Sequence, residues 1–257
     1  MHFRIPTEKK EKLKDIIERA EKDEELETYL RASNMIAIDR LGYSDHGPTH
    51  IKLVANIGLK ILRLLTSRGV KASVVRDYGM TNEDAEVIVF LSSVLHDIGH
   101  SVHREKHEDY SVPLAIPLID RFLKGTYDPR EATIIKTETL HAMVAHQRGM
   151  KPLTIEAGIL RVADALDMKK GRARIPFQAG EVNIHSVSAL AVENVAISAG
   201  VEKPVLVRIT LSNSSGIFQI DEMLKKKMEG TLIRNYINIE VKIEGEWEKR
   251  IIDELNF

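Results

Sequence analysis

The stretch VIVFLSSVLHDIGH, residues 87–100, begins as an apolar run and finishes in the polar pair His96-Asp97. A helix that is apolar on most of its faces is normally buried. Thr81, followed by Asn and two acidic residues, is a good N-cap for this helix, and we expect Gly99 to end it. The pattern therefore predicts a core helix whose carboxyl end presents an imidazole and a carboxylate.

Helical spacing of apolar residues continues on both sides of this stretch, from about Thr7 to Met168. We expect a first helix over residues 7–31 and another with Pro48 in its first turn. After Gly180, apolar and polar residues alternate and β-branched residues are frequent, which favours strands. The sequence predicts a mainly α protein: a helical domain over residues 1–178, then a small α/β domain over residues 179–257 with strands at 205–211 and 236–243 and a helix at 220–228.

The composition excludes several classes of function. The 257 residues carry 37 Lys+Arg and 38 Asp+Glu, and this balance disfavours nucleic acid as a partner. There is no cysteine, so disulfides, thiolate ligands and cysteine nucleophiles are excluded. The N-terminus is charged almost from the start, and no window approaches the roughly 18 apolar residues of a membrane span. We expect a cytoplasmic protein with no membrane partner.

Histidine is the most informative residue type. Eight of the ten histidines fall between His46 and His146, within the predicted helical domain. His46 and His50 lie on either side of the start of one predicted helix. The pair His96-Asp97 ends another, where the helix dipole favours a nearby cation.

Asp164 adds a carboxylate to this set. It lies in the middle of a third apolar helix, where a buried carboxylate is costly unless it is paired, for example with Arg161, or bound to metal. Imidazoles and carboxylates brought together from three helices are typical of a site for a divalent transition ion.

With these residues in this order, the chain resembles the HD superfamily of metal-dependent phosphohydrolases over roughly residues 30 to 170. That family has a histidine on an early helix, a His-Asp pair that ends a later one, and a downstream aspartate. The resemblance implies a divalent metal, Mn, Fe, Co, Ni or Zn with Mg as a further option, which lowers the pKa of a bound water that attacks phosphorus. The implied metal ligands are His50, His96, Asp97 and Asp164.

The resemblance also implies roles for other histidines. His100 stands four residues after His96, where the superfamily places groups near the substrate phosphate. His46 takes the place of the proton-donating histidine of the related cyclic nucleotide phosphodiesterases, and capping of the next helix is its alternative role. His107 and His146 resemble the additional histidines of dinuclear members, so the site is expected to hold one or two ions.

Basic residues close to these positions are candidates for binding a polyanionic substrate. Arg40 precedes His46 by six residues, and we expect it to reach the same cavity. Four more cations directly follow the helix of Asp164, where their alternative role is to offset the helix dipole and face water. They are Lys169, Lys170, Arg172 and Arg174.

We therefore expect a metal-dependent phosphohydrolase that cleaves a phosphate ester or anhydride of a nucleotide or a related small molecule. His46, Asp97 and His100 are its predicted catalytic residues. Two alternatives remain: a di-iron oxygenase on the same scaffold, and a non-catalytic sensor of a nucleotide or metal. The predicted α/β domain offers no catalytic constellation, and we expect it to mediate homo-oligomerisation, cover the mouth of the site or sense a ligand.

Overall fold

The apolar run at residues 87–95 lies at the centre of the helical domain. It belongs to helix α5 (Asn82–Leu95), in which every residue from Asp84 onward is buried. Thr81 caps this helix, as predicted: its hydroxyl accepts a hydrogen bond from the Asp84 N–H, and the Asp84 carboxylate accepts one from the Thr81 N–H. The neighbouring helices therefore bury their apolar faces against α5.

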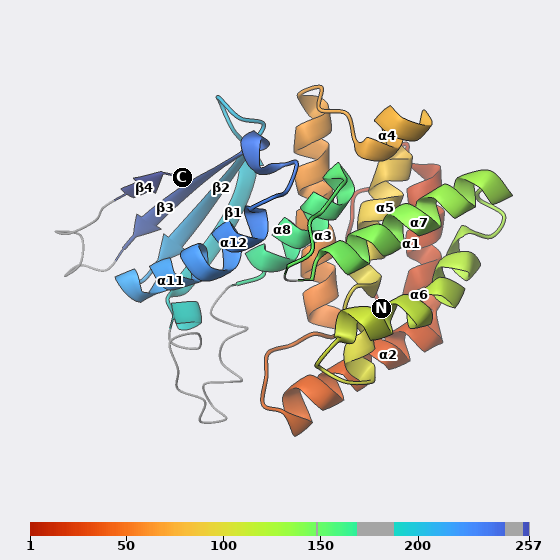
Figure 1. Ribbon diagram of the computed structural model, residues 1–257, viewed down its shortest axis with the longest axis horizontal. Helices are drawn as coiled ribbons and strands as arrows, with labels where there is room; N and C mark the ends of the chain where they lie inside the picture. The colour runs from red at the N-terminus through yellow and green to blue at the C-terminus, as the bar shows by residue number, and fades with distance from the viewer. Residues whose placement is uncertain (148, 169–187, 245–253, 257) are drawn as a thin grey trace.

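The computed structural model describes residues 1–147, 149–168, 188–244 and 254–256. Figure 1 shows a helical bundle on one side and a twisted sheet on the other, so the predicted fold class is confirmed. The predicted domain boundary at residues 178 and 179 lies outside the described residues. The described helices of the bundle are α1 (Glu11–Lys22), α2 (Glu24–Asn34), the π-helical η1 (Met35–Arg40), α3 (Pro48–Ser67), α4 (Ser73–Tyr78), α5, the 3-10 turn η2 (Ile98–Ser101), α6 (His107–Leu123), α7 (Pro129–Ala145) and α8 (Ile155–Leu166).

The prediction of one continuous helix over residues 7–31 is wrong. The chain leaves the helical conformation at Asp23, which separates α1 from α2. The Asp23 carboxylate accepts a hydrogen bond from the N–H of Leu26 at 2.8 Å and caps α2. An aspartate is a favoured N-cap, so the break satisfies backbone donors that a new helix leaves free.

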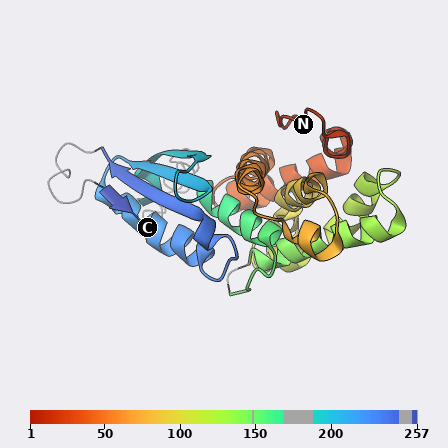
Figure 2. The same ribbon diagram turned by 90° about the horizontal axis from the view of Figure 1, so that it is seen from above.

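The carboxyl-terminal part is a four-stranded sheet in the order β1-β2-β3-β4. Its outer pairs are antiparallel, and the central pair, β2 with β3, is parallel. A helical crossover joins the two parallel strands, and its last turn lies beside α8 in both views (Figures 1 and 2). The elements are β1 (Val192–Ala199), β2 (Val205–Leu211), η3 (Ser214–Gly216), α11 (Ile217–Gln219), the π-helical η4 (Ile220–Lys225), α12 (Lys226–Met228), η5 (Arg234–Tyr236), β3 (Ile237–Ile243) and β4 (Glu254–Asn256).

The sheet and the bundle share one apolar core. Gly158 of α8 lies directly against the segment that follows α12, where a β-carbon on it would lie 3.4 Å from the Cβ of Thr231 and 3.5 Å from a side-chain carbon of Ile233. The end of the crossover is therefore held close to the helix that carries Asp164. No helix in the described part of the chain is long and apolar enough to cross a membrane.

Gly99 does not end α5, which stops at Leu95, but lies in η2 and lets α6 approach closely. A β-carbon on Gly99 would lie 2.0 Å from the carbonyl oxygen of His107 and 2.5 Å from the backbone nitrogen of Ser111. The Gly99 N–H donates to the Ser111 hydroxyl at 2.8 Å, and that hydroxyl donates to the carbonyl of His96 at 2.7 Å. This contact fixes the turn that carries Asp97 relative to α6.

We predict that Gly99→Ala lowers the free energy of unfolding by about 3 kcal/mol, because the new methyl group would overlap backbone atoms that have no room to move. Gly79→Ala is the matched control. A β-carbon on Gly79 meets no atom within 4 Å, so only its positive φ of 71° opposes the change, at about 1 kcal/mol. Urea denaturation of both variants measures the difference, and equal losses would contradict the close packing at Gly99.

Candidate metal centre

Asp97 lies at the centre of the histidine cluster, buried just beyond the end of α5. Its Oδ2 is 3.3 Å from Nε2 of His50 and 3.4 Å from Nε2 of His96. Its Oδ1 faces the opposite way, 3.2 Å from Nε2 of His107 and 3.8 Å from Nε2 of His146. Oδ1 is also 3.8 Å from Nε2 of His100, so the two oxygens of one carboxylate face different sets of histidines.

Asp164 joins the first of these sets. Its Oδ1 is 3.4 Å from Nε2 of His50 and 4.0 Å from Nε2 of His96. Its Oδ2 accepts a hydrogen bond from the ammonium group of Lys227, a residue of α12 that the sequence analysis did not single out. The suggested partner Arg161 instead donates to the carbonyl of Met150.

Outer hydrogen bonds orient the imidazoles. In four of the histidines around Asp97, Nδ1 lies against an oxygen that can only accept, so Nδ1 carries a proton and Nε2 faces the cluster. The sequence analysis missed all of these acceptors. They are the Asp167 carboxylate for His50, at 2.6 Å, and the carbonyls of Ser93 for His96, at 3.0 Å, of Arg104 for His107, at 2.9 Å, and of Met143 for His146.

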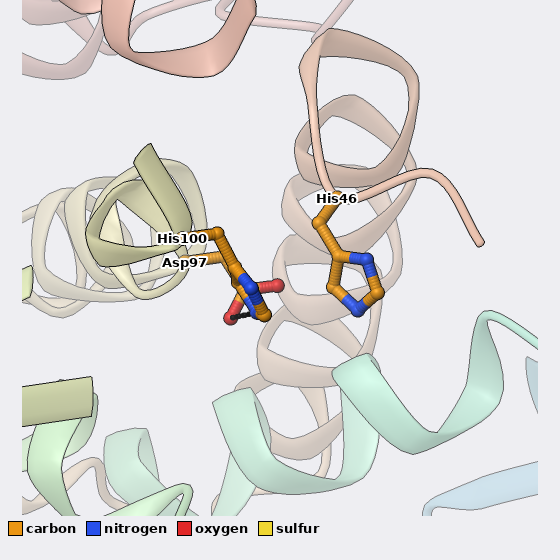
Figure 3. Close-up of side chains that lie close together, drawn as sticks. All are labelled: His46, Asp97 and His100. Atoms are coloured by element: carbon orange, nitrogen blue, oxygen red, sulfur yellow. Dashed lines mark ion pairs between the residues drawn. The ribbon is translucent and has the colours of Figure 1, made fainter. Parts of the chain in front are cut away.

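Two further histidines extend the cluster. His46, from the loop before α3, lies beside His100 of η2, and Figure 3 shows these two side chains with Asp97. The two rings are 4.5 Å apart, and the ring of His100 stacks on that of His107 at 3.9 Å. His46 does not cap α3, whose N-cap is Gly47, and its Nδ1 instead donates to the carbonyl of Ser44 at 2.7 Å.

His100 is the clearest sign that the cluster takes a ligand. Its side chain is 1% exposed, and both ring nitrogens lack a hydrogen-bond partner within the described part of the chain. A buried polar group left without a partner is costly and rare. An ion or an anionic substrate in the cluster would supply the missing partner.

Three sets of ligand atoms lie close enough together to hold an ion, each within 4.8 Å. All three sets contain Asp97, and none contains His141, whose Nε2 accepts from the N–H of Leu153. The donors are imidazoles and carboxylates, which suit divalent transition ions. The sets are His50 with His96 and Asp97; Asp97 with His107 and His146; and His46 with Asp97 and His100.

Burial and mutual contact keep four of these groups in the protonation state that metal binding requires. Burial lowers the pKa of His100 to about 4 and that of His146 to about 3, so both are neutral near pH 7. Burial by itself would raise the pKa of Asp97, but the surrounding histidines hold it well below its usual range. The pKa of Asp164 is lowered in the same way, chiefly by Lys227 and His50.

Of the candidate substrate-binding cations, Arg40 alone lies in the described part of the chain, and it does not contact the cluster. Arg40 is exposed at the end of η1, and no candidate ligand in the described ranges forms an ion pair or hydrogen bond with it. Lys169, Lys170, Arg172 and Arg174 lie outside the described residues. Arg104, which the sequence analysis passed over, lies beside the cluster with its guanidinium 3.8 Å from the ring centre of Tyr43.

Comparison with known proteins agrees with this geometry. A family model described as HD domain matches residues 49–169, a range that contains most of the cluster. The chain belongs to the HD superfamily of metal-dependent phosphohydrolases. It is 44% identical over 234 residues to an uncharacterised protein, MJ1020, of Methanocaldococcus jannaschii, and the match covers 91% of this chain and 90% of the relative.

The metal-free protein is expected to lose stability as the pH falls from 7 to 5. In the unfolded chain histidine takes up its proton near pH 6.5, whereas His100 and His146 in the folded protein do so only near pH 4 and 3. The unfolded state thus binds more protons in this window, and each of the two residues accounts for a loss of about 1–2 kcal/mol. The raised pKa of His107, which hydrogen-bonds to Asp97, opposes part of this loss.

Urea denaturation of protein treated with EDTA, at pH 7 and at pH 5, measures this effect. His146→Asn is expected to reduce the loss, and His103→Asn, on an exposed loop, is the matched control. A free energy of unfolding that did not fall between the two values of pH would contradict the neutral, buried state of these histidines.

Proposed function

We propose that the chain is a phosphohydrolase that cleaves a phosphate ester or anhydride of a nucleotide or a related small molecule, and that Asp97 would help to hold two divalent ions. The observation that carries this proposal is the division of the Asp97 carboxylate. One oxygen faces His50 and His96, and the other faces His107, with His100 and His146 somewhat farther away. Two ions on one carboxylate are a common arrangement for phosphoryl transfer.

In this proposal the first ion is held by His50, His96, Asp97 and Asp164. The second is held by Asp97 with His107 and His146. Such a donor set suits Mn²⁺, Fe²⁺, Co²⁺, Ni²⁺ or Zn²⁺ better than Mg²⁺, which prefers oxygen ligands. When bound, the ions supply an acidified water and polarise the phosphoryl group.

In this proposal, His100 and His46 contact the substrate or the attacking water. Neutral His100 offers one N–H donor and one acceptor from a buried ring, which fits contact with a phosphate oxygen or an attacking water. His46 is less buried, and the bond from its Nδ1 to Ser44 leaves Nε2 facing the cluster, where it can exchange a proton with a leaving group. Asp97, at the centre of the cluster, would help to hold both ions.

The same two sets of ligands favour a second candidate, a di-iron oxygenase. Two ions on a shared carboxylate, ligated by imidazoles without any thiolate, also suit a pair of irons. The two functions separate in solution, because the oxygenase would consume oxygen with two tightly bound irons and would release no phosphate. The cytoplasmic location and homo-oligomerisation expected from the sequence stay predictions.

The reaction is tested by phosphate release from a panel of mono-, tri- and cyclic nucleotides with Mn²⁺, Co²⁺, Ni²⁺ or Fe²⁺. Turnover is expected with at least one substrate and is expected to fall to background in Asp97→Ala, since that change removes a ligand of both ions. His103→Ala, in an exposed loop nearby, should keep full activity. Turnover that survived in Asp97→Ala would rule out the proposed mechanism.

The number of ions is tested by metal analysis after gel filtration. The wild type is expected to hold two ions per chain, and the double variant His107→Ala/His146→Ala is expected to hold one. Asp97→Asn should lose affinity for both, because the neutral amide removes the shared charge. A wild type with a single ion, unaffected by the double change, would contradict the second subsite.

A further inference from the structure

Lys227 is a cation that the carboxyl-terminal domain places in the metal centre of the bundle. It lies in α12, and its ammonium group contacts Oδ2 of Asp164 across 63 positions of the sequence. Its two lysine neighbours do not share this environment. Lys225 pairs with Asp221 at 2.6 Å and Lys226 pairs with Glu222, both one turn back on the same helical run. Of the three lysines, Lys227 is the one that forms an ion pair with a candidate ligand.

Lys227 also marks an accessible side of the site. The side chains of His50 and His96 are fully buried, that of Asp164 is 14% exposed, and that of Lys227 is 23% exposed. Exposure therefore increases from the first set of ligands through Asp164 to Lys227. A substrate that enters from this side meets the ammonium group before it reaches the buried ligands.

The ammonium group has capacity for a second anion. It carries three N–H donors, and within the described residues its one hydrogen-bond partner is Asp164. Lysine is a compact point charge on a flexible stem, and it is well suited to a phosphate oxygen. The other oxygen of Asp164 stays directed at His50 and His96, so binding a substrate anion need not disturb that ligand.

We propose that Lys227 binds an anionic oxygen of the substrate phosphate while it holds Asp164 in place. This inference rests on the proposed function and adds a residue to it: the carboxyl-terminal domain completes the substrate site of the bundle. The contacts of Gly158 with Thr231 and Ile233 keep that domain against α8, so Lys227 is presented from a fixed position. The role of the carboxyl-terminal domain would then be to supply a cation that binds the substrate phosphate.

The test is a calorimetric titration of inorganic phosphate into protein loaded with Mn²⁺ and freed of unbound metal. Lys227→Met keeps the length and apolar stem but removes the charge, and we expect it to weaken phosphate affinity about tenfold with the bound Mn²⁺ unchanged. Lys227→Arg should restore most of the affinity. Lys226→Met, one residue away on the surface, is the matched control and should bind phosphate like the wild type.

The outcomes separate this inference from the proposed function. Equal phosphate affinity in the wild type and Lys227→Met would overturn the role of Lys227, as would a variant whose only defect is loss of Mn²⁺. A wild type that binds no phosphate would also overturn it. Phosphate binding that depends on Lys227, in a protein that hydrolyses no member of the nucleotide panel, would support Lys227 and count against the proposed reaction. With an active substrate, Lys227→Met should raise KM more than it lowers kcat.

Discussion

The buried charge of Asp97 is the constraint on which the rest of the structure depends. A carboxylate in the interior is costly unless partners surround it, and here the partners are His50, His96, His107 and His146. They come from α3, α6 and the ends of α5 and α7, so the bundle must hold four elements in register to surround one residue. The close approach of α6 at Gly99 is one result of this constraint. The packing of the helices is therefore also what brings the candidate ligands together.

Hydrogen bonds and ion pairs from residues around the cluster also orient its side chains. Apart from His100, each histidine around Asp97 is held through Nδ1 by an acceptor that lies behind it, which leaves Nε2 directed inward before any ion arrives. Asp164 is held in the same manner, with Lys227 on one oxygen and the imidazoles of His50 and His96 near the other. Ligands that are oriented in advance lose little freedom when an ion binds, and such outer contacts commonly tune metal affinity.

The sequence predicted the structure correctly where an element depends on residues that are close together in the chain. The capped helix at Thr81, the strand at residues 205–211 and the helix that starts at Pro48 all follow from short-range patterns, and the structure has them. Three of the outer acceptors could also have been predicted, because each is the backbone carbonyl three residues before its histidine. The histidines concerned are His96, His107 and His146. The Asp23 cap that starts α2 is a local signal as well, but the helical apolar spacing on both sides of it outweighed it in the prediction. The contact of Lys227 with Asp164 could not be predicted, because it joins residues that no local spacing relates.

Anomalous diffraction from a crystal grown with Mn²⁺ would show whether Asp97 binds two ions. We expect two peaks, one beside Oδ2 of Asp97 among His50, His96 and Asp164, and one beside Oδ1 among His107 and His146. A single peak that leaves one of these oxygens without an ion would contradict this expectation. Peaks away from Asp97 altogether would contradict the whole assignment of the centre.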